Sequence, residues 1–386
     1  MTRFKKTILF IHRWLGFISG LVVFIVSITG CIFCFQDEIQ DAIHSYRKVE
    51  IRQEPYLPPS TLKAIALKDH PKATASYIYY YGTDRPAIVL ANFSKDELNY
   101  IYLNPYNGKL LHTENPATNF FIIVEYIHLY LLLPPKIGTL IVGTSVIIFV
   151  VLMITGIILW WPKRRSDRKR SFNIKWNGRW RRVNYDLHNV LGFYATSIAI
   201  ILAITGLSIA FNWVNDSIYT AANLGKKYPA EKAVPKSDTL KSTSATSPAI
   251  DLAFRQAQRQ SPKAQMFLIY DPAGKAESTG VTAYAKSLRF YQSDEYYFDK
   301  YNGKLLKALP HTKKSAGMRM NAMNYDIHVG QILGLTGKVI AFLASLICAS
   351  LPLTGFIVWL GKRKKTKKKT VKDISHRKTH ARLQTN

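Results

Sequence analysis

Four long segments without Lys, Arg, Asp or Glu limit what this chain can fold into. They cover residues 14–36, 137–162, 189–215 and 339–361. At a helical rise of about 1.5 Å per residue, each is long enough to cross a hydrocarbon core about 30 Å thick. Core helices of soluble proteins seldom run so far without a charge, so we predict four transmembrane helices. The first follows a basic start and is too long for a cleaved signal peptide, which predicts a retained anchor.

The net charge of +29 would suit a nucleic-acid-binding protein, but the positions of the basic residues favour a membrane protein. Ten Lys and Arg lie in residues 163–182, eleven lie in residues 362–382, and a further group flanks the first span. Four crossings place these three groups on one side of the membrane. This is the positive-inside pattern, so both termini and the middle loop are expected in the cytoplasm. Attraction to anionic membrane lipid explains the charge, and no nucleic-acid partner is expected.

The spans divide the chain into eight expected segments. In chain order these are a cytoplasmic start with the first span (1–36), an outer domain (37–126), the second span with the segment before it (127–162), a basic cytoplasmic loop (163–186), the third span (187–214), a second outer domain (215–325), the fourth span with the segment before it (326–361) and a basic cytoplasmic tail (362–386).

The two halves of the chain repeat the same motifs. His12 and His188 each begin a His-x-x-Leu-Gly-Phe sequence, and each lies 18 residues before the glycine of a Thr-Gly pair. The second and fourth spans also share a Thr-Gly pair, Thr155-Gly156 and Thr354-Gly355, followed four residues later by Trp. This pattern predicts a tandem repeat with a pseudo-twofold axis along the membrane normal. Close helix packing is the favoured role of the Thr-Gly pairs, and room for a flat cofactor is the alternative.

The outer segments also correspond. Tyr-Asn-Gly-Lys-Leu-Leu occurs at residues 106–111 and 301–306, and Asn-Gly after alternating aromatic residues is a strong hairpin signal. A helical pattern lies upstream in each copy, at residues 61–70 and 250–260. We therefore predict two small α+β outer domains, each with one helix on an antiparallel sheet. Residues 223–248, rich in Lys, Ser, Thr and Pro, are expected to form a mobile insertion.

Four of the ten histidines occupy the entrances of the four spans. His12 and His188 are equivalent in the repeat and form an expected inner pair, and His128 and His328 form an expected outer pair. Two opposed imidazoles on facing helices suit axial ligation of a haem iron, and the alternative is that they are interfacial anchors. Pro134-Pro135 after His128 predicts a helix break there, whereas none is expected after His328.

Nearby residues offer further candidate roles. Arg13, Arg181, Arg182 and Arg319 could pair with haem propionates, although the positive-inside rule explains the first three equally well. Cys31 and Cys34 form a C-x-x-C within an apolar span, where packing is the favoured interpretation over a redox dithiol, and Cys348 is expected to pack. The other histidines, His44, His70, His112, His311, His376 and His380, are expected at the surface.

These motifs resemble the PepSY-associated transmembrane family over roughly residues 5–365. The repeated His-x-x-Leu-Gly-Phe, the Thr-Gly pairs and the Trp before each basic stop carry the resemblance, and the Tyr-Asn-Gly-Lys-Leu hairpins resemble PepSY domains. The resemblance implies two PepSY-like periplasmic domains and, as in the family's di-haem inner-membrane ferric-siderophore reductases, haem ligation. By resemblance, His12, His128, His188 and His328 take the ligand roles and bind two haem b groups.

Together with the haem sites, the resemblance implies a multi-pass protein of a bacterial inner membrane that reduces a ferric siderophore or other ferric chelate in the periplasm. A quinol or a cytoplasmic reductase is expected as electron donor. Tyrosines 77, 79, 81, 291, 296 and 297 could contact the chelate, although strand propensity is the favoured explanation for most of them. The alternative is a non-catalytic, membrane-anchored PepSY protein that binds or regulates a peptidase or another periplasmic partner.

Overall fold

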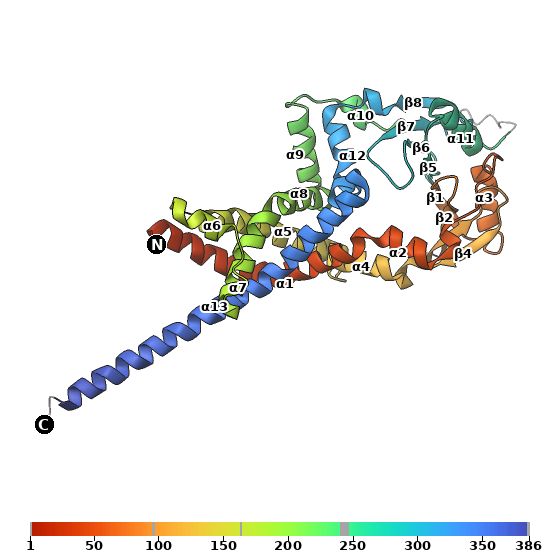
Figure 1. Cartoon of the computed structure of the whole chain (residues 1–386). Helices are drawn as coiled ribbons and strands as arrows, with labels where there is room; N and C mark the ends of the chain where they lie inside the picture. The colour runs from red at the N-terminus through yellow and green to blue at the C-terminus, as the bar shows by residue number, and fades with distance from the viewer. Residues whose placement is uncertain (1, 95–96, 163, 240–246, 384–386) are drawn as a thin grey trace. The chain divides into compact units, whose positions relative to one another are not determined.

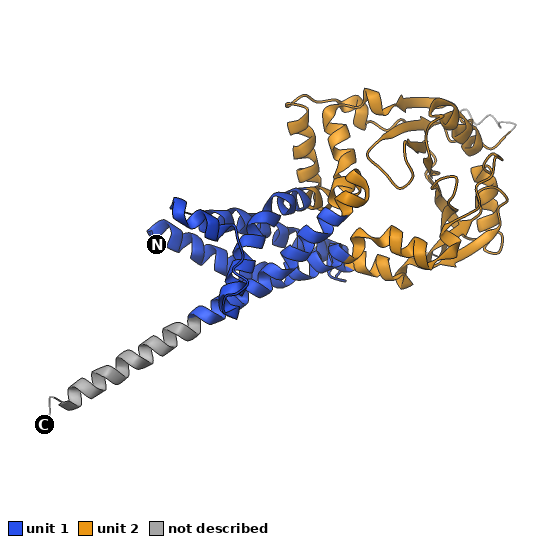
Figure 2. Ribbon diagram, in the orientation of Figure 1, with its two compact units in different colours: residues 1–31, 127–204, 339–386 blue, residues 32–126, 205–338 orange. Residues whose placement is uncertain are grey.

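The computed structural model describes residues 2–94, 97–162, 164–239 and 247–383, with side chains up to Lys362. The side chains of the predicted basic tail beyond Lys362, including His376 and His380, lie outside this part. The chain forms two compact units, which Figure 2 colours separately. The first contains residues 1–31, 127–204 and 339–386, and the second contains residues 32–126 and 205–338.

Within the described residues, four helices are long and apolar enough to cross a membrane, which confirms the predicted number (Figure 1). They are α1 (Arg3–Cys34), α5 (Pro135–Trp160), a third span made of α7 (Trp180–Asp186), the π-helical turn η4 (Leu187–Leu191) and α8 (Gly192–Ala210), and a fourth made of η6 (Gln331–Leu333) and the start of α13 (Gly334–Leu383).

The spans turn large apolar side chains outward and small ones inward. Ile18 and Leu21 are 68% and 71% exposed, whereas Ala199, Ala203 and Cys348 pack in a buried cluster. Water would disfavour such an apolar exterior, but a lipid environment accommodates it. Small residues at the contacts let the helices approach closely.

The second unit is built on one antiparallel sheet of eight strands, in the order β4-β3-β2-β1-β5-β6-β7-β8. The strands are β1 (Thr74–Tyr80), β2 (Ala87–Ser94), β3 (Glu97–Leu103), β4 (Leu110–Glu114), β5 (Met266–Tyr270), β6 (Thr279–Tyr284), β7 (Ser293–Phe298) and β8 (Leu305–Leu309). The predicted hairpins are confirmed as β3–β4 and β7–β8, and Gly108 and Gly303 take φ values of 71° and 70° in their turns.

The sequence predicts a separate sheet for each outer domain, but the structure joins the two four-stranded halves. Strand β1 pairs with β5 from Tyr77 opposite Tyr270 to Tyr80 opposite Phe267. Each is the first strand of its half and would otherwise leave an edge of unpaired backbone groups. Pairing these two edges satisfies them and produces a single continuous sheet.

One face of the sheet is covered by the two predicted helices, α3 (Pro59–Ala66) and α11 (Ala249–Gln260). Ile78, Tyr80 and Val89 point into this core and are 1% exposed or less. Because side chains alternate along a strand, their neighbours Tyr79 and Leu90 lie on the opposite face. That opposite face forms a wall of the pocket described below.

Shorter helices connect the spans and the sheet. They are α2 (Gln36–Ile43), η1 (Ser45–Arg47), η2 (Pro116–Thr118), α4 (Phe120–Tyr130), η3 (Arg165–Asp167), α6 (Arg168–Ser171), α9 (Asn212–Ala222), α10 (Pro229–Lys232), η5 (His311–Lys313) and α12 (Ala316–His328).

Part of the predicted mobile insertion is packed against the sheet. The Lys307 ammonium donates to the carbonyls of Ala230, Glu231 and Ala233, at 2.7–2.9 Å. Lys236 forms a β-bridge with Glu277. Residues 240–246 of the insertion lie outside the described part of the chain.

Candidate functional site

His12 and His188 lie opposite each other in the first unit. His12 is in α1 and His188 is in the π-helical turn η4. Their ring centres are 6.4 Å apart, and the ring planes are inclined at 85°. Metal–imidazole bonds of about 2 Å place two rings on opposite sides of one ion with their centres roughly 6–6.5 Å apart. The separation therefore suits axial ligation of one iron, and π-helical turns are frequent at functional sites.

Each of the four predicted histidines contacts a Thr-Gly pair on another helix. The distances from the imidazole Nδ1 to the threonine hydroxyl oxygen are 2.9 Å for His12 and Thr155, 3.0 Å for His188 and Thr354, 3.1 Å for His128 and Thr29, and 3.1 Å for His328 and Thr205. Close helix packing is therefore not the main use of these pairs, because each threonine holds an imidazole.

The glycine of each pair provides the space for the ring. A Cβ added at Gly206 would lie only 2.8 Å from Cε1 of His328, and one at Gly355 would lie 3.0 Å from Cε1 of His188. At Gly30 and Gly156 the corresponding distances are 3.4 and 3.5 Å. A larger residue would press on the imidazole, most strongly at Gly206.

The hydrogen bonds determine which ring nitrogen carries the proton. The hydroxyl of Thr29 lies 2.8 Å from the carbonyl oxygen of Ile25, and the hydroxyls of Thr155 and Thr354 lie 2.8 Å from equivalent carbonyls. Each hydroxyl donates to its carbonyl and so accepts from the imidazole. Nδ1 of His128 is also 2.9 Å from the Val26 carbonyl oxygen, which can only accept. For the three imidazoles bonded to these threonines, Nδ1 is therefore the protonated nitrogen, and the lone pair of the ring is on Nε2.

The outer histidines lie near the ends of two short helices. His128 belongs to α4 and His328 ends α12. The sequence predicts a break after His128 only, but a break follows both residues. Leu131 and Leu132 adopt left-handed backbone, with φ of 55° and 58°, before α5 begins.

Glycines make the corresponding break after His328, so the prediction of an unbroken segment there is wrong. Gly330 and Gly334 have φ values of 77° and 66°. Glycine also allows the next helix to fit under each break, because a Cβ at Gly138 would collide with the Tyr130 carbonyl and one at Gly337 with the Gly330 carbonyl. The proline pair therefore does not set His128 apart from His328.

Arg13 is the candidate propionate partner that the structure supports best. Its guanidinium lies 5.8 Å from the Phe10 ring and 5.7 Å from the Trp14 ring, and its Nε is buried without a hydrogen-bond partner among the described residues. A buried donor without a protein acceptor is suited to an external carboxylate. Arg182, by contrast, already donates to Asp186 at 2.7 Å.

The remaining candidates have packing roles. His112 stacks on Tyr46 at 4.1 Å and His70 on Phe93 at 3.7 Å. Cys31, Cys34 and Cys348 are buried, and the structure joins none of them in a disulfide. Among the described residues, no group of three or more His, Cys, Asp or Glu is arranged to hold a metal ion.

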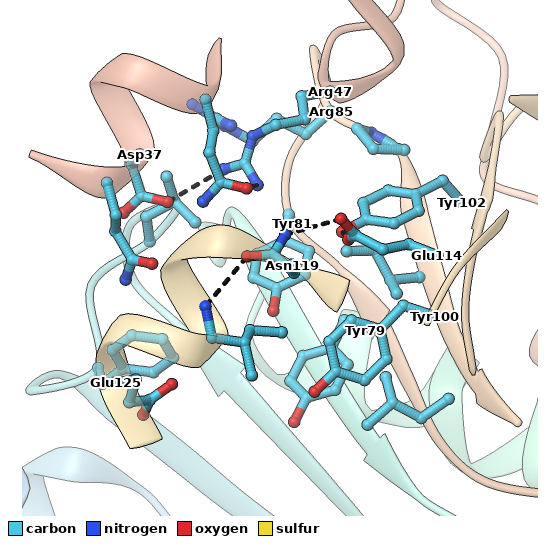
Figure 3. A pocket seen from close by; sticks show the side chains of 18 of the residues that line it. Asp37, Arg47, Tyr79, Tyr81, Arg85, Tyr100, Tyr102, Glu114, Asn119 and Glu125 are labelled. Carbon is cyan, nitrogen blue, oxygen red and sulfur yellow. Dashed lines mark hydrogen bonds and ion pairs between the residues drawn. The ribbon is translucent and has the colours of Figure 1, made fainter. Parts of the chain in front are cut away.

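A pocket in the second unit is a feature that the sequence reveals only in part. Its volume is about 270 Å³, and it lies over the face of β1–β3 opposite α3 and α11 (Figure 3). We call it the tyrosine pocket, because Tyr79, Tyr81, Tyr100, Tyr102 and Tyr325 line it. Of the tyrosines singled out in the sequence, Tyr79 and Tyr81 are among these lining residues, whereas Tyr296 is packed in the core.

The basic residues of the tyrosine pocket are held by aspartates. Arg47 donates to Asp37 and Asp41 at 3.0 and 2.7 Å, and Arg85 donates to Asp41 at 2.5 Å. Burial by itself would raise the pKa of Asp41, but the hydrogen bonds from Arg85 and Arg47 lower it below its ordinary value.

The tyrosines of the pocket stay protonated at neutral pH. Burial raises the pKa of Tyr79 to about 12, and it raises the pKa of Tyr81 well above its ordinary value. A neutral phenol offers both a hydrogen-bond donor and an aromatic face. The pocket therefore suits a ligand with polar edges and a flat or apolar surface.

The chain matches the model of a known protein family over most of its length. The family model described as PepSY-associated TM region matches residues 9–362. No curated protein matches the chain. The matched region includes all four histidines and every Thr-Gly pair described above.

Proposed function

The chain belongs to the PepSY-associated TM region family, and from this premise we propose that it is an inner-membrane di-haem protein that transfers electrons to ferric siderophores or other ferric chelates. The proposal includes a tandem repeat of two halves, PepSY-like domains in the periplasm and both termini in the cytoplasm. A quinol or a cytoplasmic reductase supplies the electrons.

The observation that carries this proposal is the common setting of four histidines. Each places its Nδ1 2.9–3.1 Å from a threonine hydroxyl oxygen, and each ring rests against the neighbouring glycine. A hydrogen bond on the second ring nitrogen is the usual way to orient a metal-ligating imidazole. Interfacial anchoring would not require the same Thr-Gly partner four times.

The separation of His12 and His188 supports one haem b group, and the matching Thr-Gly setting of the outer histidines is the ground for proposing a second. Nε2 of His12 and Nε2 of His188 would hold one group, with Arg13 placed to pair with a propionate, and His128 and His328 would hold the other. When bound, haem supplies reversible one-electron transfer. Held by two imidazoles, each haem would be suited to electron transfer rather than to binding of a small molecule.

Coordination chemistry explains why reduction of a ferric chelate would release its iron. Siderophores bind Fe(III) through hard oxygen ligands, and Fe(II) is held less tightly by such ligands. A one-electron reduction outside the cytoplasm would therefore release iron from the chelate. The large described domain of the second unit supplies surfaces on which such a chelate could rest.

The test is anaerobic reoxidation. Purified protein is reduced with dithionite, freed of excess reductant and mixed with ferric siderophores. The expected result is reoxidation of the haem Soret and α bands together with Fe(II) captured by ferrozine. Haems that stay reduced against every ferric chelate would contradict the proposed activity.

A further inference from the structure

Two of the helices that line the tyrosine pocket also carry the outer histidines. Glu125 lines it and precedes His128 by three residues in α4, and Tyr325 lines it and precedes His328 by three residues in α12. Three residues correspond to about 4.5 Å along a helix axis. Glu125 and Tyr325 are thus each about one helical turn from the histidine on the same helix.

The rim of the pocket contains strained backbone held in place from several sides. Leu288 lines the pocket with a φ of 55°, a conformation that is unfavourable for leucine. The Asp326 carboxylate accepts from the backbone N–H groups of Phe290 and Tyr291, at 2.9 and 2.6 Å. The Ser287 hydroxyl donates to the Tyr81 carbonyl at 2.5 Å. Strain that is held in this way is typical of ligand sites.

The charges of the pocket favour a neutral or cationic ligand. Arg47 and Arg85 are the only basic residues among the described lining residues, and both are engaged by aspartates. Glu114 accepts from Asn119 at 2.7 Å and from Tyr102 at 3.1 Å, so its neighbours are neutral groups. A ferric centre with three hydroxamates is neutral, whereas one with three catecholates is triply negative and would be repelled.

Glu125 differs from the other carboxylates of the pocket. It is not joined to either arginine, and Figure 3 shows it away from Arg47 and Arg85. Burial raises the pKa of its carboxyl group. Among the described residues, Glu125 interacts electrostatically with Tyr100 from β3 and Tyr325 from α12, and both are neutral at pH 7 because burial raises their pKa values. The other charged residues that line the pocket are Asp37, Arg47, Arg85 and Glu114.

We propose that the tyrosine pocket binds one arm of a neutral or cationic ferric hydroxamate, and that Glu125 donates a proton to that arm when the iron is reduced. This inference rests on the proposed function. One electron from the proposed haem pathway converts Fe(III) to Fe(II). The bond between iron and one hydroxamate oxygen breaks, and the proton of Glu125 moves to that oxygen. The Glu125 carboxylate then regains a proton from water.

The volume of the pocket suits one arm of the chelate rather than the whole complex. At about 270 Å³ it is smaller than most sites that enclose a drug-sized molecule. A single chelating arm fits such a volume, while the rest of the chelate lies outside. The aromatic walls and the phenol donors then contact the planar hydroxamate and its oxygens.

Binding is tested first without electron transfer. Gallium(III) trihydroxamate matches the ferric complex in charge and size and is not reduced, so its affinity is measured by calorimetry on the full protein. Leu90→Trp should fill the pocket and weaken binding at least about 10-fold, while Leu110→Trp, at a residue that is 56% exposed on β4, should leave it unchanged. Gallium tricatecholate should bind at least about 10-fold more weakly than the trihydroxamate. Absence of binding to the wild-type protein, or equal binding to both tryptophan variants, would overturn the pocket assignment.

The proton donor is tested by reoxidation kinetics. Glu125→Gln should keep gallium-chelate affinity, haem content and the rate with ferricyanide, which takes an electron without losing a ligand. Its rate with ferric trihydroxamate should fall about 100-fold at pH values below the Glu125 pKa, where the wild-type carboxyl group holds its proton, which is within the range of a positioned acid. The wild-type rate should decrease as pH rises through the Glu125 pKa, and the variant should lose this dependence. Glu97→Gln, at an exposed residue of β3, is the matched control.

The outcomes separate the two proposals. An unchanged rate and pH profile in Glu125→Gln would refute the proton-donor role. If the wild-type protein binds the gallium chelate but is not reoxidised by the ferric chelate, the proposed reductase function fails while the binding site stands.

Discussion

Substituting Gly206 by alanine tests whether this glycine provides the space for the His328 ring, and Gly156→Ala is the matched control. A Cβ at Gly206 would lie 2.8 Å from Cε1 of His328, whereas a Cβ at Gly156 would lie 3.5 Å from Cε1 of His12, an ordinary contact. To reach the separation found at Gly156, the His328 ring must move by 0.7 Å, the difference between the two distances. The same chemical change thus displaces one imidazole and spares the other.

The magnitude follows from two opposing effects. Overpacking of this kind costs about 1–3 kcal/mol. Replacing a helical glycine by alanine stabilises the helix by about 1 kcal/mol through helix propensity. Gly206→Ala is therefore expected to be destabilised by roughly 0–2 kcal/mol, and Gly156→Ala to be neutral or slightly stabilised. A ring shift of 0.7 Å is also large compared with a metal–nitrogen bond of about 2 Å.

The assay is haem content together with spin state. Gly206→Ala should lose the low-spin signal of one haem, and Gly156→Ala should retain two low-spin haems. Both variants are compared with the wild-type protein by pyridine haemochrome and by electron paramagnetic resonance. Two unaltered low-spin haems in Gly206→Ala would refute the role of Gly206 in providing space for the His328 ring.

Three further predictions concern the inner histidine pair, the ion pairs of Asp41 and the membrane topology. Thr155→Val removes the acceptor for the Nδ1 proton of His12, so haem affinity at the inner pair should fall about 10–100-fold, measured by transfer to apomyoglobin, and an unchanged affinity would contradict the orienting role. Asp41→Asn should destabilise the protein by about 1–3 kcal/mol near pH 7. Because Arg85 and Arg47 lower the pKa of Asp41, the ion pairs stabilise the fold above the ordinary pKa of an aspartate, and this stabilisation is lost as pH falls through the lowered pKa. Thermal unfolding temperatures of the variant and the wild type in detergent should therefore converge in acid. Reporter fusions after Arg165 and after Lys226 should report opposite sides of the membrane, and the same side for both would refute the four-span topology.

Much of the fold is visible in the sequence because its signals are local. Uncharged length determines a span, and Asn-Gly with flanking aromatics determines a hairpin. The joining of β1 to β5 is not visible, because it depends on two edges that lie about half the chain apart. The packed part of the insertion also depends on a distant residue, Lys307, which contacts three carbonyls there.

The histidines are visible in the sequence, whereas their contacts are visible only in the structure. The repeat singles out His12, His128, His188 and His328, and it also singles out the Thr-Gly pairs, but only the structure shows that each pair holds an imidazole. The tyrosine pocket is less accessible to sequence reasoning. Alternating tyrosines mark the strand face, yet Glu125 comes from α4 and Tyr325 from α12, elements that no local pattern connects to it.

Haem counting in histidine variants tests whether the two histidine pairs bind two haems. The pyridine haemochrome of the purified wild-type protein should give two haem b per chain. His12→Ala and His188→Ala should each give about one, with the remaining haem still low-spin. Absence of haem in the wild-type protein, or full haem content in both variants, would contradict the account.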